Sequence, residues 1–156
     1  MIRFKSNPYD YRRELPHYQK FDRAIFVTFC KRTQEPLSPR SLVLDHCLRG
    51  NNRTMHLHGV VIMPDHVHLL LTPIRNAEGW PFPLKDILKL IKGPAARSVN
   101  MLAGAHGALW QDESFDHVLR SNESFDEKLE YIRQNPVRRG LATTPGEYEW
   151  LWVEGS

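Results

Sequence analysis

Residues 54–72 read TMHLHGVVIMPDHVHLLLT, and this stretch decides the fold. Two runs rich in apolar and β-branched residues, 54–63 and 66–72, have the composition of strands. The pair Pro64-Asp65 separates them, and both residue types favour turns. The pattern therefore predicts a β-hairpin.

The flanking sequence extends this hairpin to an α+β domain. Segment 24–30, AIFVTFC, is typical of a central strand, and a helix starting at Ser38 or Ser41 is expected to end near Leu48. A second helix opens at Pro83, and a short strand is expected at 115–119. With a final helix after that strand, the order predicts an antiparallel sheet whose helices pack mainly on one face. Neither a repeat nor a linker divides the chain, so residues 1–156 are expected to form one domain.

The final predicted helix carries Tyr131. Ser124 and Glu127 form a capping-box pattern, and the helix should end near Asn135 because the residue before Pro136 disfavours the helical conformation. An apolar stripe runs along this helix at Phe125, Leu129 and Ile132. At helical spacing Tyr131 lies roughly 120–130° from that stripe, with Asn135 one turn further on the same side. A phenol can be a covalent nucleophile, although an amphipathic surface tyrosine would fit the same pattern.

Two His-x-His pairs lie in the hairpin, His56/His58 and His66/His68. Alternate residues of a strand share a face, so each pair brings two imidazoles together, and two neutral imidazoles suit a divalent metal. With a two-residue turn, the first pair falls on the opposite face from the second, so the four cannot form one cluster. Hydrogen-bonded surface histidines would give the same motif, and periodicity alone does not choose between the pairs.

Composition narrows the function classes. Of the 156 residues, 41% are hydrophobic and 25% charged, as in soluble globular proteins, and no apolar run approaches the roughly 18 residues of a membrane span. Two cysteines, Cys30 and Cys47, are too few for a disulfide framework and indicate a reducing, cytoplasmic setting. Residues 1–32 contain eight Lys/Arg against three Asp/Glu. This basic, tyrosine-containing segment suits nucleic-acid phosphates and bases, unless it is only a solvated tail.

Several blocks together resemble the HUH signature set of single-tyrosine transposases. Residues 63–71, MPDHVHLLL, resemble the HUH motif itself. Trp110-Gln111, residues 115–120 (FDHVLR) and residues 131–141 (YIRQNPVRRGL) resemble the C-terminal block of that family. Residues 12–17, RRELPH, followed by the strand at 26–29, are similar to the REP-associated tyrosine transposase branch. The resemblance spans about residues 11–142, and its ordered combination is far more specific than any one motif.

The resemblance implies a ferredoxin-like (RRM-like) fold and a set of active-site residues. It favours His66 and His68 over the other histidine pair as ligands of one Mg²⁺ or Mn²⁺ ion. The third ligand would be Asn135, with Gln134 as the fallback, and Tyr131 would be the nucleophile. Asp65 stands where many relatives have Asn; little consequence is expected, since both favour the turn.

The same resemblance implies DNA as the partner. Family members bind a DNA hairpin and cut the adjacent single strand, forming a 5′-phosphotyrosine and releasing a 3′ hydroxyl without a nucleotide energy source. The basic segment 1–23 would hold the hairpin, with Arg12, Arg13 and His17 as the expected contacts. A bacterial, nucleoid-associated protein with no membrane partner is implied, acting as a monomer or a homodimer. The tail, residues 143–156 with Trp150 and Trp152, could be an extra strand, a dimer contact or a flap over the site.

Three rival functions remain at this point. A non-catalytic nucleic-acid-binding module is the first, although Lys/Arg-Gly-Phe runs of the usual RNA-binding sheet are absent from the expected strands. A domesticated relative that recognises chromosomal hairpin repeats would have the same chemistry as an active transposase. A small metallohydrolase built on all four hairpin histidines is disfavoured because no paired carboxylate stands near them in the sequence.

Overall fold

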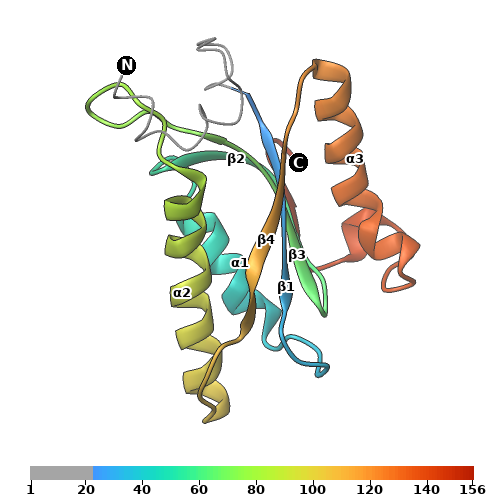
Figure 1. The fold of residues 1–156 in the computed structure, drawn as a ribbon. Coiled ribbons are helices and arrows are strands. Elements are labelled where there is room, and N and C mark those ends of the chain that lie inside the picture. Colours follow the sequence, from blue (N-terminus) through green and yellow to red (C-terminus); the bar gives the residue numbers. More distant parts are fainter. Residues whose placement is uncertain (1–22) are drawn as a thin grey trace.

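A five-stranded antiparallel sheet forms the centre of the protein (Figure 1). The structure is a computed structural model, and it describes residues 23–156. The strands are β1 (Ile25–Lys31), β2 (Met55–Ile62), β3 (His66–Pro73), β4 (Trp110–Val118) and β5 (Leu151–Val153). Their order in the sheet is β4-β1-β3-β2-β5. The first four, with two intervening helices, have the βαββαβ connectivity of the ferredoxin-like fold, so the predicted α+β class is confirmed.

Three helices cover the two faces of this sheet unequally. α1 (Arg40–Arg49) and α2 (Leu84–Ala103) lie together on one face, and α3 (Asn122–Arg138) lies on the other (Figure 1). Two of the three helices thus share a face, as predicted. The α2 helix continues through Gly93-Pro94 without ending there. Among the described residues, none of the helices combines the length and the apolar character needed to cross a membrane.

The face under α1 and α2 holds the larger core. Burial alternates along β1, where Ile25, Val27 and Phe29 point into this core and the residues between them point to the α3 face. Side chains of β2, β3 and α2 complete the cluster, among them Leu57, Leu69, Leu71, Ile87 and Ile91. Each such side chain contributes roughly 1.5–3 kcal/mol by its burial. The α3 face has a smaller apolar cluster, which leaves room there for polar groups.

The hairpin has the predicted register next to its turn. Val61 pairs with His68, and the backbone N–H of Met63 donates to the His66 carbonyl at 2.8 Å. A β-bulge between Leu57 and Gly59 then shifts the register further along β2. One extra residue reverses which face the earlier residues occupy.

The bulge makes one prediction wrong. His56 and His58 were expected on the opposite face from His66 and His68. Instead His56 pairs with Thr72, and the His58 ring packs against Phe125 of α3, so all four histidines lie on the α3 face. The two pairs still form separate groups, at opposite ends of the hairpin.

The tyrosine helix also differs from its predicted bounds. Its N-cap is Ser121, whose Oγ accepts the Ser124 N–H at 3.1 Å, so the predicted Ser124 capping box does not form. Its C-terminus lies beyond Pro136, at Arg138, because Asn135 and Pro136 are buried and the Arg139 N–H still reaches the Asn135 carbonyl at 3.0 Å. Tertiary packing outweighs the local preference of the residue before a proline. The preceding strand, β4, is longer than the expected 115–119.

The C-terminal tail is an extra strand, one of the three roles considered for it. β5 pairs with β2 at Gly59–Val61. The buried Tyr148 hydroxyl, just before it, donates to the Ile62 carbonyl at 2.6 Å. α3 packs closely on β2 at Gly59, since a Cβ there would stand 2.8 Å from a methyl carbon of Leu129.

Candidate active site

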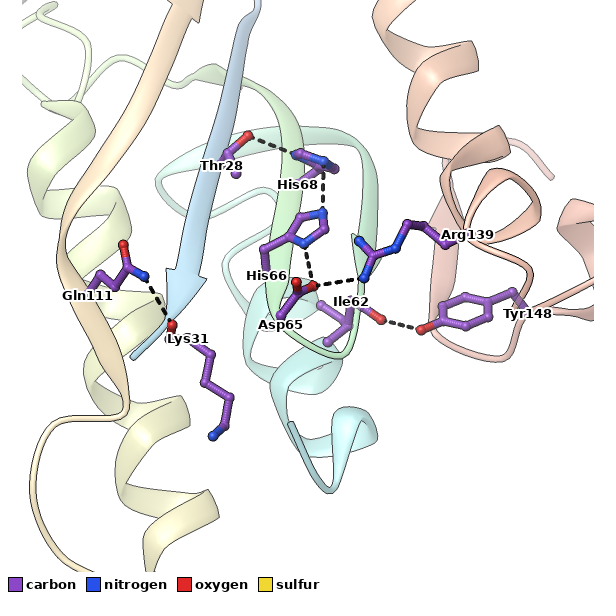
Figure 2. A network of polar contacts seen from close by, with 9 residues as sticks. All are labelled: Thr28, Lys31, Ile62, Asp65, His66, His68, Gln111, Arg139 and Tyr148. Carbon is purple, nitrogen blue, oxygen red and sulfur yellow. Dashed lines mark hydrogen bonds and ion pairs between the residues drawn. The ribbon is translucent and has the colours of Figure 1, made fainter. Parts of the chain in front are cut away.

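His66 and His68 lie side by side on the α3 face of β3 (Figure 2). Their Nε2 atoms are 3.1 Å apart and their ring centroids 4.5 Å apart. His68 is only 6% exposed. The convergence predicted from alternate strand positions is therefore present.

Hydrogen bonds at both Nδ1 atoms fix these rings. Asp65, in the hairpin turn, lies 2.7 Å from the Nδ1 of His66, and Thr28 Oγ1 of β1 lies 2.8 Å from the Nδ1 of His68 (Figure 2). Ionised Asp65 can only accept, so His66 Nδ1 carries the proton and its Nε2 presents a lone pair. Thr28 can donate or accept. His68 can thus donate from Nε2 to His66 when no ion is bound, or present a second lone pair when one is.

Electrostatics keep the buried ring neutral. Burial, followed by the charges of His66, Lys128 and Arg138, lowers the pKa of His68 to about 3. Burial favours a higher pKa for Asp65, but its hydrogen bond to His66 and the charges of His66 and Arg139 hold that pKa below its ordinary value. At neutral pH His68 is therefore a neutral imidazole and Asp65 an ionised carboxylate. These are the protonation states that a carboxylate–histidine–metal arrangement needs.

The spacing of the two nitrogens fits a divalent cation. Two ligands at adjacent octahedral positions, each roughly 2.1 Å from Mg²⁺, lie roughly 3.0 Å apart. The observed 3.1 Å between the Nε2 atoms is close to that value. Asn135, the predicted third ligand, is 4% exposed on α3. The two convergent imidazoles therefore form a donor pair able to hold an ion, and Asn135 stays the predicted third ligand.

Tyr131 lies beside this pair. Its ring centroid is 5.4 Å from that of His68 and 5.9 Å from that of Phe26, yet the residue is 41% exposed. The ring therefore borders the histidines and remains open to a large substrate. The angular offset from the apolar stripe of α3 is what places it at this border.

Basic side chains of α3 surround the tyrosine. The Arg138 guanidinium lies over the Tyr131 ring at 4.3 Å, and the Lys128 ammonium lies 5.8 Å from the same centroid. Arg139 contacts Asp65 at 3.6 Å. Helical positions three before and seven after Tyr131 share its side, a signal that could have found Lys128 and Arg138 in the sequence.

Sequence reasoning missed two further residues of the site. Phe26 stacks on His68 at 5.1 Å, and Thr28 pairs with His68 across the sheet. Both come from β1, whose pairing with β3 is non-local. The sequence predicted that Phe26 and Thr28 alternate with buried residues of β1, but it did not predict which strand lies opposite them.

The remaining predicted site residues are the fallback ligand Gln134 and three residues of the basic segment. Gln134, the fallback ligand, bonds to Glu130 along the helix at 3.0 Å. Arg12, Arg13 and His17 lie outside the described residues, so their predicted DNA contacts stay predictions.

A second group of possible metal ligands lies at the other end of the hairpin. His56, His58 and Glu154 place ligand atoms within 4.8 Å of one another. This carboxylate could not be predicted beside the histidines, because Glu154 lies 98 residues after His56 in the chain.

The chain is similar to known proteins in both sequence and fold. No model of a known protein family matches the chain. A putative REP-associated tyrosine transposase of Haemophilus influenzae is 26% identical over 86 residues, which cover 52% of this chain and 49% of that protein. The match thus spans about half the length of the curated relative.

A solved structure matches over more of the chain. It is a REP-associated tyrosine transposase bound to a REP hairpin, with a TM-score of 0.66, 18% identity, and coverage of 83% of this chain and 76% of the other. At that identity the match shows the fold. The sequence match and the fold match agree with the resemblance read from the motifs: this chain is similar to the REP-associated tyrosine transposases.

Proposed function

We propose that this protein is a metal-dependent HUH transposase that binds DNA hairpins and cleaves and rejoins the adjacent single-stranded DNA. The observation that carries the proposal is the placement of Tyr131 beside two imidazoles whose Nε2 atoms converge to 3.1 Å. The similarity to REP-associated tyrosine transposases supports it. The same proposal makes the chain a site-specific endonuclease and strand transferase.

His66, His68 and Asn135 would hold one Mg²⁺ or Mn²⁺ ion. Bound there, the ion would polarise the scissile phosphate and stabilise the charge that builds on it. Asp65 and Thr28 would keep the two imidazoles in the orientation that ligation needs.

Tyr131 would carry the covalent step. Its Oη attacks the phosphorus, the bond from phosphorus to the 3′ oxygen breaks, and a 5′-phosphotyrosine forms with a free 3′ hydroxyl. The phenol gives up its proton, and the departing 3′ oxygen takes one up. Attack of a 3′ hydroxyl on the phosphotyrosine reverses these steps and rejoins DNA. The ester energy is kept throughout, so no nucleotide is consumed.

Arg138 and Lys128 would bind the phosphate next to Tyr131. Both cations already lie close to its ring, so they would be near a phosphate that the Tyr131 hydroxyl attacks. Salt should weaken such binding, since Lys and Arg displace the counterions of DNA. A relative bound to a REP hairpin makes a DNA hairpin with a flanking single strand the proposed partner. We propose that segment 1–23 binds the DNA hairpin through Arg12, Arg13 and His17. We also propose that residues 1–156 form one domain and that the protein is nucleoid-associated.

Tyr131 is proposed to act in cis. The link from β4 to α3 is short and anchored: Leu119 is buried and its N–H donates to the Ala24 carbonyl at 2.9 Å. Only Arg120 and Ser121 lie between this anchor and α3, which leaves little length for α3 to cross to a second chain. A monomer therefore suffices for the chemistry.

The test is a covalent adduct with DNA. A hairpin-bearing oligonucleotide with a single-stranded flank is incubated with protein and Mn²⁺, and adducts are separated on a denaturing gel. Tyr131→Phe and His66→Ala should each abolish the adduct, while Tyr131→Phe should still bind the hairpin. Asn135→Ala should weaken Mn²⁺ binding, and the matched control Gln134→Ala should not.

Other outcomes would redirect the proposal. An adduct that persists in Tyr131→Phe would remove the nucleophile assignment. Hairpin binding by well-folded protein without cleavage, across several hairpins and metals, would favour a non-catalytic module that recognises chromosomal hairpin repeats. A mixture of Tyr131→Phe and His66→Ala chains tests the cis arrangement, because recovery of the adduct would mean that the sites are shared between chains.

A further inference from the structure

The group His56, His58 and Glu154 has no part in the proposed cleavage. His56 Nε2 lies 2.7 Å from Glu154 Oε2, and His58 Nδ1 lies 3.6 Å from Glu154 Oε1. The two imidazole centroids are 4.8 Å apart. Within residues 23–156, no other group of three His, Cys, Asp or Glu side chains comes this close together.

The β-bulge of β2 creates this group. Regular alternation back from Gly59, which faces α3, would turn both His58 and His56 to the opposite face. The extra residue brings both histidines to the α3 face instead. The pairing of β5 with β2 supplies the third member. The backbone N–H of Glu154 donates to the His58 carbonyl at 3.0 Å, which continues the ladder and brings the carboxylate close to a ring nitrogen of each histidine.

The contacts of His58 orient it as a ligand. Its Nε2 lies 2.8 Å from Thr72 Oγ1, and its ring packs edge-on against Phe125 at 4.9 Å. With Nε2–H donated to Thr72, the Nδ1 lone pair points toward Glu154. This is the outer-shell hydrogen bond that ligating imidazoles usually have. His56 and Glu154 are partly exposed, so an ion can enter from solvent.

We propose that His56, His58 and Glu154 form a second metal site, one for a zinc-class transition ion. Two imidazoles and one carboxylate suit Zn²⁺, which takes four ligands and leaves one position here for water. The site is distinct from the His66/His68 pair: Thr72, the partner of His58, follows His68 by four residues on β3, which is roughly 13 Å.

A bound ion would fasten the C-terminal strand to the sheet. Glu154 directly follows β5, a strand of only three residues, whereas both histidines belong to the long strand β2. Metal bonds from Glu154 to the two histidines would hold β5 against the edge of β2. The ion would thus stabilise the fold without touching the proposed cleavage site.

Zinc titration of chelator-treated full-length protein tests the site. Binding is followed by competition with a chromophoric chelator, and the melting temperature is recorded at each step. The wild type should bind two equivalents of Zn²⁺, because the His66/His68 pair also accepts this ion. Glu154→Gln, at a side chain 49% exposed, should bind one equivalent and keep its fold. His66→Ala should also bind one equivalent, at the second site.

The thermal readout separates the two sites. In His66→Ala, Zn²⁺ at about a hundred times its dissociation constant should raise the melting temperature by roughly 5–10 °C. Adding Glu154→Gln to that variant should remove the shift and weaken zinc binding by at least tenfold. Unchanged zinc affinity after Glu154→Gln in the His66→Ala chain would overturn the proposal, and so would a His66→Ala chain that binds no zinc. In the second case the three side chains form only a hydrogen-bonded ion pair. Either result leaves the proposed cleavage function untouched, because that function is read from the Tyr131 adduct.

Discussion

Replacing Asp65 should weaken the proposed metal site at His66 and His68 while barely changing stability. Asp65 accepts the Nδ1–H of His66 at 2.7 Å, which directs Nε2 toward His68. Loss of such an outer-shell partner typically costs 10–100-fold in metal affinity or activity, which corresponds to roughly 1.4–2.7 kcal/mol. Asp65→Ala should therefore lower Mn²⁺ affinity and the rate of adduct formation by about that factor.

The effect on folding should be smaller than the effect on metal binding. The side chain of Asp65 is 60% exposed, and its contact with Arg139 is 3.6 Å long. An exposed ion pair of this kind contributes roughly 0–1 kcal/mol. Urea unfolding of Asp65→Ala should thus stay within about 1 kcal/mol of the wild type. Asp65→Asn should lie between the two proteins in Mn²⁺ affinity, because its amide oxygen can still accept the His66 proton and it keeps the turn preference.

Calorimetric titration with Mn²⁺ and gel assays of the adduct measure both effects. Arg139→Ala is the matched control: it breaks the ion pair with Asp65 but keeps the hydrogen bond to His66, so its Mn²⁺ affinity should change less than that of Asp65→Ala. Equal affinities for wild type and Asp65→Ala would refute the orienting role. Equal losses in Asp65→Ala and Arg139→Ala would show that the charge pair, and not the imidazole contact, matters.

Three more predictions concern the helix cap and the buried imidazole. Ser121→Ala should lower the free energy of unfolding by about 1 kcal/mol in a urea titration, whereas Ser124→Ala should change it less, since only Ser121 accepts a backbone N–H of α3; the reverse order would contradict the cap. Thr28→Val removes the partner of His68 Nδ1 and should weaken Mn²⁺ binding by roughly 10–100-fold in calorimetry; unchanged affinity would count against that bond. Without metal, acidification from pH 7 to pH 5 should cost about 2 kcal/mol through His68, because its folded pKa of about 3 is below the unfolded value of 6.5, so this contribution is full above pH 6.5 and is lost as pH falls toward 3. Chemical unfolding of wild type and His68→Gln at both pH values measures it, and equal pH dependence in the two proteins would refute the assignment.

The sequence predicts best what local geometry controls. The register at the hairpin turn followed from two turn residues, so the opposition of Val61 and His68 was predictable. The offset of Tyr131 from the apolar stripe followed from helical spacing alone. The choice of His66 and His68 over the other pair required the ordered family motifs.

Non-local packing controls the rest. The bulge at Leu57–Gly59 could not be predicted from the alternation of apolar and polar residues in β2. It depends on how β2 packs against β5 in the sheet and against α3 on one face. Ser121 and Ser124 are the same residue type, so the local sequence does not decide which of them caps the helix. The cap is Ser121, two residues after Leu119, whose N–H is bonded to the Ala24 carbonyl. The same holds for Glu154, whose position over His58 follows from a strand pairing nearly a hundred residues away in the sequence.

The unequal cores of the two sheet faces explain how a polar site fits into this domain. The large cluster under α1 and α2 is apolar and can supply most of the stability. On the α3 face the apolar cluster is small, and His68 and Asn135 are buried at its border. A buried imidazole is tolerated there because it is neutral and bonded to Thr28. Destabilising changes should therefore be concentrated on the α1/α2 face, whereas changes that abolish the proposed DNA cleavage should be concentrated on the other face of the same strands.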